Sequence, residues 1–461
     1  MERNKTTCVE RILSILDPGS FVEVGAYVGK KGNSDDLTGV VCGYGAVDGR
    51  LVYIFSQDPD RRLGAMDARQ ASKIERLYQM ALTNGAPVVG VFDSAGVPVE
   101  DGAEALDAYG RVMRCVTKAS GVIPQIAYVA GVCAGMSATL AAMFDFAVMI
   151  EGQSRYYVTS PFVLGNSSGN AFNAAECGVA SLLADSEAGA AQKIRALIAM
   201  IPSNDTDGTE TVQSSDDLNR ALDLVPDESG SYDAKALIAA IADDGRFLSL
   251  QDAYGKDMII GFASIGYYVC GIVANDAHVS SGAISPEGAR KAARFLSFCD
   301  CFDIPVLTLV DSVGVLASES AECDPASTAL ARLAQSYTVS HHAKVTVVVG
   351  KAYGAALTLM GSHSVGADTV LALEHSRIAA MSPQAAVAFL WNDRITPEVS
   401  RESLEKKWSE EFADPMIAAS QGVIDDIIPT SELRARVCAA FYMLSRKSTH
   451  APDRRHVNLP L

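Results

Sequence analysis

The chain has 461 residues, and its 38 Lys and Arg against 55 Asp and Glu give a formal net charge of −17. This acidic balance argues against a nucleic-acid-binding protein, which needs a clustered basic surface. The apolar fraction of 49% excludes an intrinsically disordered or collagen-like chain. A chain of this length is expected to form two or three domains, or two large ones, that bury their own cores.

The N-terminal residues contain no long apolar run, and the apolar stretches elsewhere are too short to span a bilayer. We therefore expect a cytoplasmic protein. The ten Cys residues form no Cys-x-x-Cys pair, so we expect reduced thiols and no metal site. His341 and His342 are adjacent, and we expect both on the surface of a helix.

The elements of the first half recur in the second half. A helix over residues 10–17 or 237–244 precedes an apolar strand, and the next helix carries Lys73 or Lys291. A continuous apolar run, typical of a strand covered on both faces, then ends at Asp-Ser-x-Gly. Strands that alternate with helices in this way predict the α/β class.

The match between the halves holds at a nearly constant offset. The pairs at an offset of 218 are Asp58 and Asp276, Lys73 and Lys291, Pro87 and Pro305, Asp93 and Asp311, and Gly96 and Gly314. Farther along the chain, Gly131 and Gly135 match Gly350 and Gly354 at 219. A single long period indicates a duplicated domain rather than a solenoid of short repeats. We predict two domains, residues 1–225 and 226–461.

In each half, a third strand runs directly into a helix start made of small residues, at 131–138 and 350–357. A strand that stops at Gly and turns into a helix exposes backbone amides that have no partner. Such amides attract negative charge and suit a developing oxyanion, for which one fixed donor is worth about 3 kcal/mol. Close helix–strand packing is the alternative reason for these small residues.

Side-chain catalysis is poorly supported by the sequence. No His lies at an Asp-Ser-x-Gly turn or at a glycine junction. We expect Asp93 and Asp311 to cap the turns that follow them, and Lys73 and Lys291 to be solvated or salt-bridged. An enzyme of this kind would rely on backbone electrostatics rather than on a side-chain acid or base.

The combined motifs resemble one family. The segments that carry the resemblance are residues 49–58 (GRLVYIFSQD), 84–102 (NGAPVVGVFDSAGVPVEDG), 120–135 (SGVIPQIAYVAGVCAG), 291–316 (KAARFLSFCDCFDIPVLTLVDSVGVL) and 350–362 (GKAYGAALTLMGS). The chain resembles the carboxyltransferase subunits of biotin-dependent acyl-CoA carboxylases, of the propionyl-CoA carboxylase β type. The α subunits of biotin-dependent decarboxylases, such as methylmalonyl-CoA decarboxylase, and the large transcarboxylase subunit are close relatives of that type.

The resemblance implies two tandem crotonase-like (ClpP/crotonase) domains. Residues 1–225 would bind the acyl-CoA, and residues 226–461 would bind biotin carried by another chain. Such proteins commonly form a homo-oligomer, a hexamer built from dimers. The implied partners are a biotin carboxyl carrier protein and either a biotin carboxylase subunit or a membrane decarboxylase subunit.

The resemblance also implies roles for particular residues. The backbone at Gly135-Met136 would stabilise the acyl-CoA enolate, and the backbone at Ala355-Ala356 would stabilise the ureido oxygen of biotin. Thr358 stands where the family has an Asp tied to acyl-chain selectivity, and Met136 stands where it has a second Gly. The implied cofactor-binding residues are Ser94, Ala95, Gly96, Ser312, Gly314 and Gly354.

The implied reaction is transfer of a carboxyl group between carboxybiotin and the α-carbon of propionyl-CoA or acetyl-CoA. The same chemistry run in reverse, in a methylmalonyl-CoA or glutaconyl-CoA decarboxylase complex, is the second interpretation. A CoA-binding subunit without activity is the third, because Met136 and the loss of an Arg at Pro98 depart from the family pattern. A crotonase-type hydratase is disfavoured, because that reaction needs two placed Glu residues and only one crotonase unit, whereas this chain is duplicated.

Overall fold

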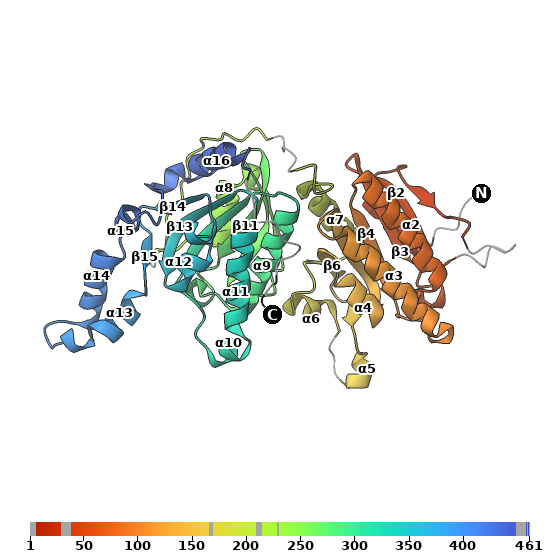
Figure 1. Cartoon of the computed structure of the whole chain (residues 1–461), viewed down its shortest axis with the longest axis horizontal. Coiled ribbons are helices and arrows are strands. Elements are labelled where there is room, and N and C mark those ends of the chain that lie inside the picture. Colours follow the sequence, from red (N-terminus) through yellow and green to blue (C-terminus); the bar gives the residue numbers. More distant parts are fainter. Residues whose placement is uncertain are drawn as a thin grey trace. The chain divides into compact units, whose positions relative to one another are not determined.

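The computed structural model describes residues 6–28, 38–165, 169–208, 214–227, 230–448, 458 and 460. The chain folds into two compact units. Unit 1 contains the residues up to Gly208 together with Gln251–Ala253, and unit 2 contains the remainder. Each unit has its own eight-stranded sheet (Figure 1). The functional division between residues 1–225 and 226–461 stays a prediction.

The sheet of unit 1 has the strand order β1-β2-β3-β4-β5-β6-β8, and β7 pairs with β5. Its strands are β1 Val22–Val24, β2 Val40–Val47, β3 Arg50–Gln57, β4 Val88–Ser94, β5 Gln125–Ala134, β6 Phe146–Ile150, β7 Arg155–Tyr157 and β8 Leu182–Ala184. The first three strands are antiparallel, and the strands from β3 to β8 pair in parallel.

The sheet of unit 2 repeats this order strand for strand, as β9-β10-β11-β12-β13-β14-β16 with β15 beside β13. Its strands are β9 Phe247–Leu250, β10 Met258–Ile265, β11 Tyr268–Asn275, β12 Val306–Ser312, β13 Lys344–Tyr353, β14 Thr369–Leu373, β15 Arg377–Ala379 and β16 Asp426–Ile428. The same directions of pairing recur. The predicted α/β class and the predicted duplication are therefore confirmed.

Helices connect the strands and cover both faces of each sheet. Those of unit 1 are α1 Thr7–Ile15, α2 Ala68–Asn84, α3 Ala103–Ala119, α4 Met136–Ala141, α5 Pro161–Leu164, α6 Ala171–Glu176 and α7 Glu187–Met200. Those of unit 2 are α8 Ala234–Ile241, α9 Pro286–Cys301, α10 Glu319–Cys323, α11 Ala326–Val339, α12 Ala355–Leu359, α13 Pro383–Leu390, α14 Arg401–Phe412, α15 Pro415–Ser420 and α16 Leu433–Leu444. Among the described residues, no helix is long and apolar enough to cross a membrane.

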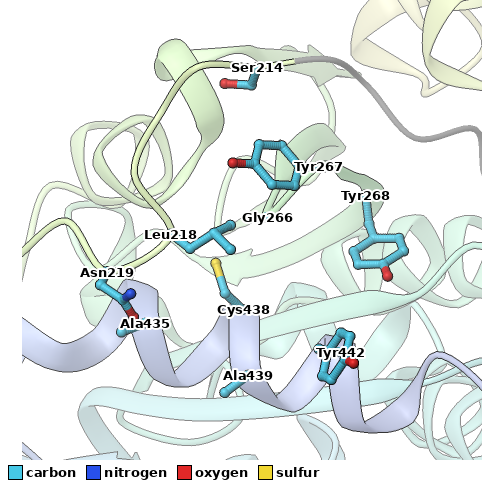
Figure 2. A pocket seen from close by; sticks show the side chains of 10 residues that line it. All are labelled: Ser214, Leu218, Asn219, Gly266, Tyr267, Tyr268, Ala435, Cys438, Ala439 and Tyr442. Carbon is cyan, nitrogen blue, oxygen red and sulfur yellow. The ribbon is translucent and has the colours of Figure 1, made fainter.

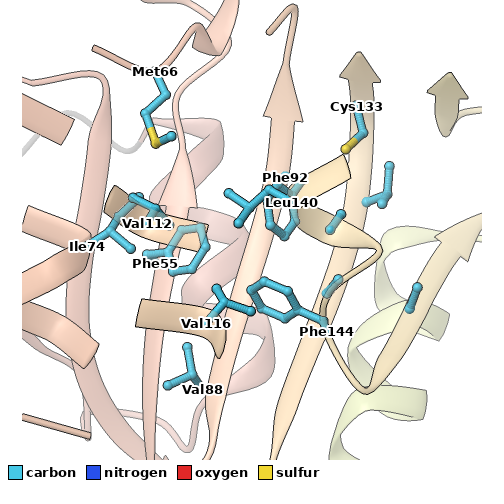
Figure 3. Close-up of a cluster of buried hydrophobic side chains, with 14 of the residues drawn as sticks. Phe55, Met66, Ile74, Val88, Phe92, Val112, Val116, Cys133, Leu140 and Phe144 are labelled. Carbon is cyan, nitrogen blue, oxygen red and sulfur yellow. The ribbon is translucent and has the colours of Figure 1, made fainter. Parts of the chain in front are cut away.

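The core of unit 1 lies between the sheet and the pair α2 and α3 (Figure 3). Phe92 on β4 is at its centre, with edge-to-face contacts to Phe55 and Phe144 at ring distances of 5.7 and 5.4 Å. Each fully buried aromatic ring contributes about 2–3 kcal/mol of transfer free energy. Because all seven residues of β4 are buried, the strand is apolar throughout until it reaches Asp93.

The expected solvation of Lys73 and Lys291 was wrong. Both side chains are buried, and the Nζ of Lys73 donates to the Val40 carbonyl at 2.7 Å. The Nζ of Lys291 donates to the Tyr254 carbonyl at 2.9 Å. In each unit the long apolar stem packs in the core, and backbone carbonyls satisfy the ammonium group.

The expectation for the two adjacent His residues was half wrong. The side chain of His341 is 47% exposed, but that of His342 is fully buried near Asp300. Both residues follow the end of α11 rather than lying on its surface. Burial lowers the pKa of His342, so its ring stays neutral in the folded protein.

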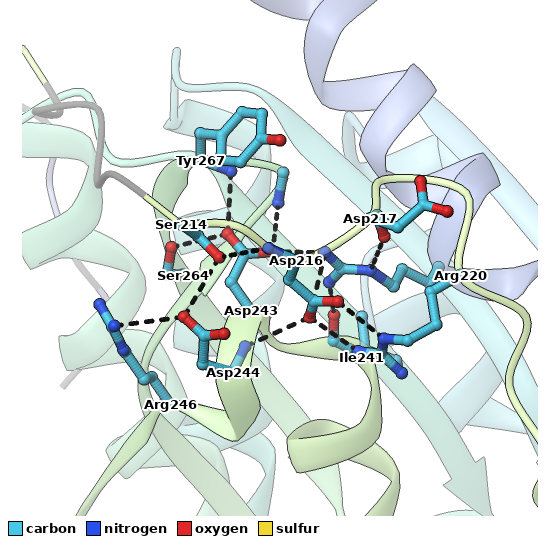
Figure 4. Close-up of polar contacts among 12 residues, drawn as sticks. Ser214, Asp216, Asp217, Arg220, Ile241, Asp243, Asp244, Arg246, Ser264 and Tyr267 are labelled. Atoms are coloured by element: carbon cyan, nitrogen blue, oxygen red, sulfur yellow. Dashed lines mark hydrogen bonds and ion pairs between the residues drawn. The ribbon is translucent and has the colours of Figure 1, made fainter.

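A buried ion pair joins distant parts of unit 2 (Figure 4). The Asp243 carboxylate lies 2.6 Å from Arg434 on α16, and both side chains are fully buried. The same carboxylate accepts hydrogen bonds from the Gly266 and Tyr267 amides, at 3.0 and 2.9 Å, in the turn between β10 and β11. Burial alone raises the pKa of Asp243, but the bonds from Tyr267 and Arg434 outweigh it, and the pKa is lowered overall.

Unit 1 contains the same arrangement in a more exposed form. Asp17 accepts from the Asp48 and Gly49 amides in the β2–β3 turn, at 3.1 and 3.0 Å. Arg195 on α7 lies 2.8 Å from Asp17, and each side chain is 27% exposed. The first helix, the hairpin and the last helix of each unit are therefore fixed together by one Asp and one Arg.

We predict that Arg434→Met destabilises unit 2 by about 3–5 kcal/mol, because the Asp243 charge stays buried without its partner. The matched change Arg195→Met should cost about 1 kcal/mol or less, since the Asp17 pair is partly solvated. Thermal unfolding followed by circular dichroism measures both. Equal losses of stability in the two variants would contradict the conclusion that burial makes the Asp243–Arg434 pair the more costly one to break. Because the pKa of Asp243 is lowered on folding, its contribution should be present at neutral pH and be lost as the pH falls through that lowered value.

Candidate active site

Each unit has one strand-to-helix junction at a glycine. Gly135 has φ 58° and ψ −120° between β5 and α4, and Gly354 has φ 55° and ψ −132° between β13 and α12. Only glycine adopts this region readily, which explains its presence at both positions. The Gly135 amide donates to the Tyr157 carbonyl at 2.9 Å, and the Gly354 amide donates to the Ala379 carbonyl at 3.0 Å.

The amides that follow each glycine have no acceptor among the described residues. Neither α4 nor α12 has a side-chain cap, and no described group accepts a hydrogen bond from the Met136, Ala355 or Ala356 amide. The Ser137 amide is equally without a described acceptor. Each junction therefore presents two adjacent donors at the positive end of a helix. Of the predicted pair Gly135-Met136, only Met136 retains an available amide.

The side chains of the residues at the two helix starts differ in their exposure to solvent. Met136 is partly buried and packs against the core of unit 1, so its side chain contributes to packing there. Ala355, the first residue of α12, is exposed, and Ala356 is buried. Thr358 is exposed on α12, one turn further on. Its predicted role in selectivity stays a prediction.

The Asp-Ser-x-Gly turns lie beside the junctions, because a Cβ added to Gly96 or Gly314 would lie 3.0 or 3.6 Å from the Ala134 or Tyr353 carbonyl oxygen. The Ser94 and Ser312 hydroxyls accept from the Gly96 and Gly314 amides, each at 3.1 Å, and close the turns. In the turn of unit 1, Ala95 lies between Ser94 and Gly96 and is exposed. The Tyr109 hydroxyl then links turn and junction, because it lies 3.0 Å from the Gly96 carbonyl and 2.6 Å from the Ser137 hydroxyl.

The Asp of each turn does not cap its own turn, contrary to expectation. The pairing of β4 with β5 shifts between Phe92 and Ser94, so that β5 bulges opposite Asp93. Asp93 Oδ1 accepts from the Val132 amide in that bulge at 3.0 Å. A methyl group on Gly131 would lie only 2.3 Å from Asp93 Oδ1. The carboxylate thus occupies the space that the bulge opens.

The bulge makes β5 change partners before it reaches the junction. Residues 126–129 pair with β6, and residues 132–134 pair with β7. Unit 2 repeats this change, because residues 345–348 pair with β14 and residues 351–353 pair with β15. There, Asp311 Oδ1 accepts from the Lys351 amide at 2.9 Å, opposite Gly350.

A second duplicated element was missed at the level of sequence. Leu63 and Ser281 have positive φ, at 53° and 55°, in tight turns after β3 and β11. The glycines that follow, Gly64 and Gly282, touch the backbone of the Asp-Ser-x-Gly turns, since an added Cβ would lie 1.8 and 2.0 Å from the Asp93 and Asp311 carbonyls. The shared Gly-Ala at the same 218-residue offset was the available signal.

A pocket of about 880 Å³ lies elsewhere in unit 2 (Figure 2). Leu218, Tyr267, Cys438 and Tyr442 are among its lining residues, which come from the segment 214–219, from the β10–β11 turn with the start of β11, and from α16. The turn is at the amino-terminal end of β11, whereas the junction follows the carboxyl-terminal end of β13. This pocket is therefore separate from the glycine junction.

The whole chain matches a known family. Residues 1–459 match the model of the carboxyl transferase domain. The chain belongs to the carboxyl transferase family. The propionyl-CoA carboxylase carboxyltransferase subunit of Haloferax mediterranei is 34% identical over 100% of this chain and 94% of that protein. The methylmalonyl-CoA decarboxylase α subunit of Veillonella parvula is 34% identical over the same shares.

The fold agrees with solved structures of carboxyl transferases. A transcarboxylase 12S structure, described as a hexamer assembly with methylmalonyl-CoA bound, superposes with a TM-score of 0.92 at 31% identity over 99% of this chain and 93% of that one. The crotonase-like fold and the assignment as an enzyme subunit expected from the sequence are confirmed. A multi-domain long-chain acyl-CoA carboxylase, at 24% identity and a TM-score of 0.81, shares the fold.

We predict that Gly131→Ala and Gly350→Ala each destabilise the protein by about 1–3 kcal/mol, because the added methyl overlaps the Asp carboxylate. Gly110→Ala is the control. Gly110 lies within α3 with open space around its Cβ position, so this change should stabilise by about 0.5–1 kcal/mol. Thermal unfolding checks all three. A tolerated methyl at position 131 or 350 would contradict the packing described for the bulge.

Proposed function

We propose that this carboxyl transferase moves a carboxyl group between carboxybiotin on another chain and the α-carbon of a short acyl-CoA, propionyl-CoA or acetyl-CoA. The supporting observation is that two equivalent junctions each present two amide donors without a described acceptor. A transfer between two carbonyl-containing reactants develops negative charge on two oxygens, and it needs one such site for each.

Each junction then serves one reactant. The Met136 and Ser137 amides hold the thioester oxygen as enolate charge develops, and the Ala355 and Ala356 amides hold the ureido oxygen. Two amides match the two lone pairs of either carbonyl oxygen. Biotin supplies the ring nitrogen that carries the carboxyl group. Removing one fixed donor from an oxyanion site costs about 10²–10³ in rate.

Unit 1 contains no His residue, which agrees with a mechanism that uses backbone amides. All seven His residues follow residue 277 in the sequence, and so lie in unit 2. The two Asp residues beside the junctions bind strand amides rather than facing the donors. In this proposal the chain supplies charge stabilisation and position, and the proton moves between the reactants.

The relatives guide the remaining assignments. Their names give propionyl-CoA and methylmalonyl-CoA as substrates, so we assign a short acyl chain. We assign a biotin carboxyl carrier protein and a biotin carboxylase subunit as partners, a cytoplasmic location, and a homo-oligomer like the transcarboxylase hexamer. The α subunits from Veillonella parvula and Propionigenium modestum favour the reverse direction as the second candidate, with a membrane decarboxylase subunit as partner.

The first test measures decarboxylation of malonyl-CoA and methylmalonyl-CoA by the purified chain, with and without free biotin. We expect biotin-dependent release of CO₂ from at least one of them, because both junctions must be occupied for transfer. The preferred thioester identifies the acyl pocket. CoA binding without turnover of either substrate would favour a different acyl-CoA, such as glutaconyl-CoA, or a subunit without activity.

The second test removes one donor at a time. Met136→Pro and Ala355→Pro should each lower the biotin-dependent rate about 100-fold, because proline lacks the amide but is tolerated at the first position of a helix. Met136→Ala and Ala355→Gly keep the amide and are the controls, which should stay within about threefold of the parent. Circular dichroism confirms folding. Full activity in either folded proline variant would exclude its junction as an oxyanion site.

A further inference from the structure

Asp93 and Asp311, the carboxylates beside the two junctions, differ in whether a positively charged side chain pairs with them. Asp93 Oδ2 lies 2.8 Å from Nη1 of the buried Arg11 on α1. Arg11 also binds Glu187 at 2.9 Å, so the charge on Asp93 belongs to a three-residue network. Both oxygens of Asp93 therefore have a donor in the described structure.

The equivalent carboxylate in unit 2 pairs with no arginine among the residues that the structure describes. Asp311 is 3% exposed, and no described group donates a hydrogen bond to its buried Oδ2. Counted from the matched pair Asp17 and Asp243, the position of Arg11 is occupied by Leu237 on α8. Leu237 is part of the apolar core of unit 2, so α8 offers no cation there.

The groups that face Asp311 come from three directions. Besides donating its amide, Lys351 on β13 has its ammonium 3.3 Å from the Ser231 hydroxyl, near the carboxylate. The charged and titratable groups that interact with Asp311 are Lys351, Asp227, Tyr353 and His375. Asp227 opposes the effect of Lys351, and burial lowers the pKa of His375 and keeps its ring neutral. Within the described part of the chain, therefore, no cation forms an ion pair with Asp311 as Arg11 does with Asp93.

The Asp311 carboxylate lies directly before the second junction in the structure. The Lys351 amide that it binds begins the three-residue pairing of β13 with β15, and Gly354 follows directly. If the Lys351 amide had no acceptor, the bulge would contain a buried amide without a hydrogen bond, which is unfavourable. The position of the Ala355 and Ala356 amides therefore depends on Asp311 through three residues of strand.

We propose that Asp311 is a positioning residue for the second junction, and that its ionised carboxylate holds the bulge of β13 in the form that aims the Ala355 and Ala356 amides. The inference rests on the proposed function for the reaction that those amides serve. Keeping a buried charge without a salt bridge costs stability, and a site that retains such a cost does so where the charge has a use.

The charge on Asp311 also makes the second junction sensitive to pH. Burial raises the pKa of the Asp311 carboxyl, against the opposing effect of the Lys351 amide and the nearby Ser231 hydroxyl. As the pH falls, Asp311 is then neutralised earlier than an ordinary Asp. A neutral acceptor holds the Lys351 amide less strongly than a carboxylate does. Transfer should therefore decline on the acid side of its pH profile.

The test compares Asp311→Asn with Asp93→Asn in the full chain. Asparagine keeps an acceptor oxygen for the strand amide but carries no charge. For Asp311→Asn we expect an unchanged or higher Tm, because a group with a raised folded pKa costs stability when it is ionised at neutral pH. We also expect a biotin-dependent rate about fivefold lower, with the acid limb of the pH profile lost. For Asp93→Asn we expect a lower Tm, since Arg11 loses a buried partner.

A merely structural Asp311 would change stability and rate together. Hydrogen exchange of the peptide that contains residues 351–356, measured by mass spectrometry, gives a readout that needs no turnover. We expect faster exchange there in Asp311→Asn and parent-like exchange there in Asp93→Asn. A wild-type rate at every pH with unchanged exchange in Asp311→Asn would overturn the proposal. If the parent chain shows no biotin-dependent turnover, the proposed function fails, and the exchange comparison alone still decides whether Asp311 holds the bulge.

Discussion

The geometry of both junctions depends on a buried carboxylate that fills a bulge in the neighbouring strand. At the bulge, β5 and β13 stop pairing with β6 and β14 and begin pairing with β7 and β15. The carboxylate accepts the first amide after the bulge, and the glycine opposite provides the room. A bulge re-aims a strand at the cost of ladder hydrogen bonds, and the Asp side chain replaces the bond that is lost. The amides without a described acceptor at the helix starts follow from this change of direction.

Duplication explains why the same solution occurs twice, but the two copies have diverged in their electrostatics. In unit 1 the ion pair at the hairpin is partly solvated and the bulge carboxylate is paired with Arg11. In unit 2 the ion pair at the hairpin is fully buried, and no described arginine pairs with the bulge carboxylate. Charge compensation has thus been placed at opposite ends of the two sheets. In both units the carboxylate still accepts the amide of the strand opposite it, so the bulge itself is kept.

A reaction that relies on amide donors depends on the conformation of the backbone rather than on the type of side chain. Side-chain catalysts can be read from a sequence as an acid, a base or a nucleophile, whereas an amide donor belongs to every residue but proline. Here, the residue at the first helical position is Met136 in one unit and Ala355 in the other, and neither side chain carries chemistry. What makes these positions special is that the preceding glycine turns the chain so that their amides point away from the strand.

The sequence by itself determined the duplication, the α/β class, the two glycine junctions and, by resemblance, the family. These follow from periodic apolar runs and from residues such as Gly135 and Gly354, whose dihedral angles no other residue adopts easily. It gave the wrong environment for Lys73 and Lys291, because a long side chain can bury its stem and bond to carbonyls without a local signal. The tertiary structure alone decided that Asp93 and Asp311 hold the neighbouring strand, that the Gly135 amide is already used, and that, in the part of the chain described, only one of the two carboxylates is paired with an arginine. Each of these depends on groups about 20 to 80 residues apart in the chain, and their distance and hydrogen-bond geometry exist only once the sheet has formed.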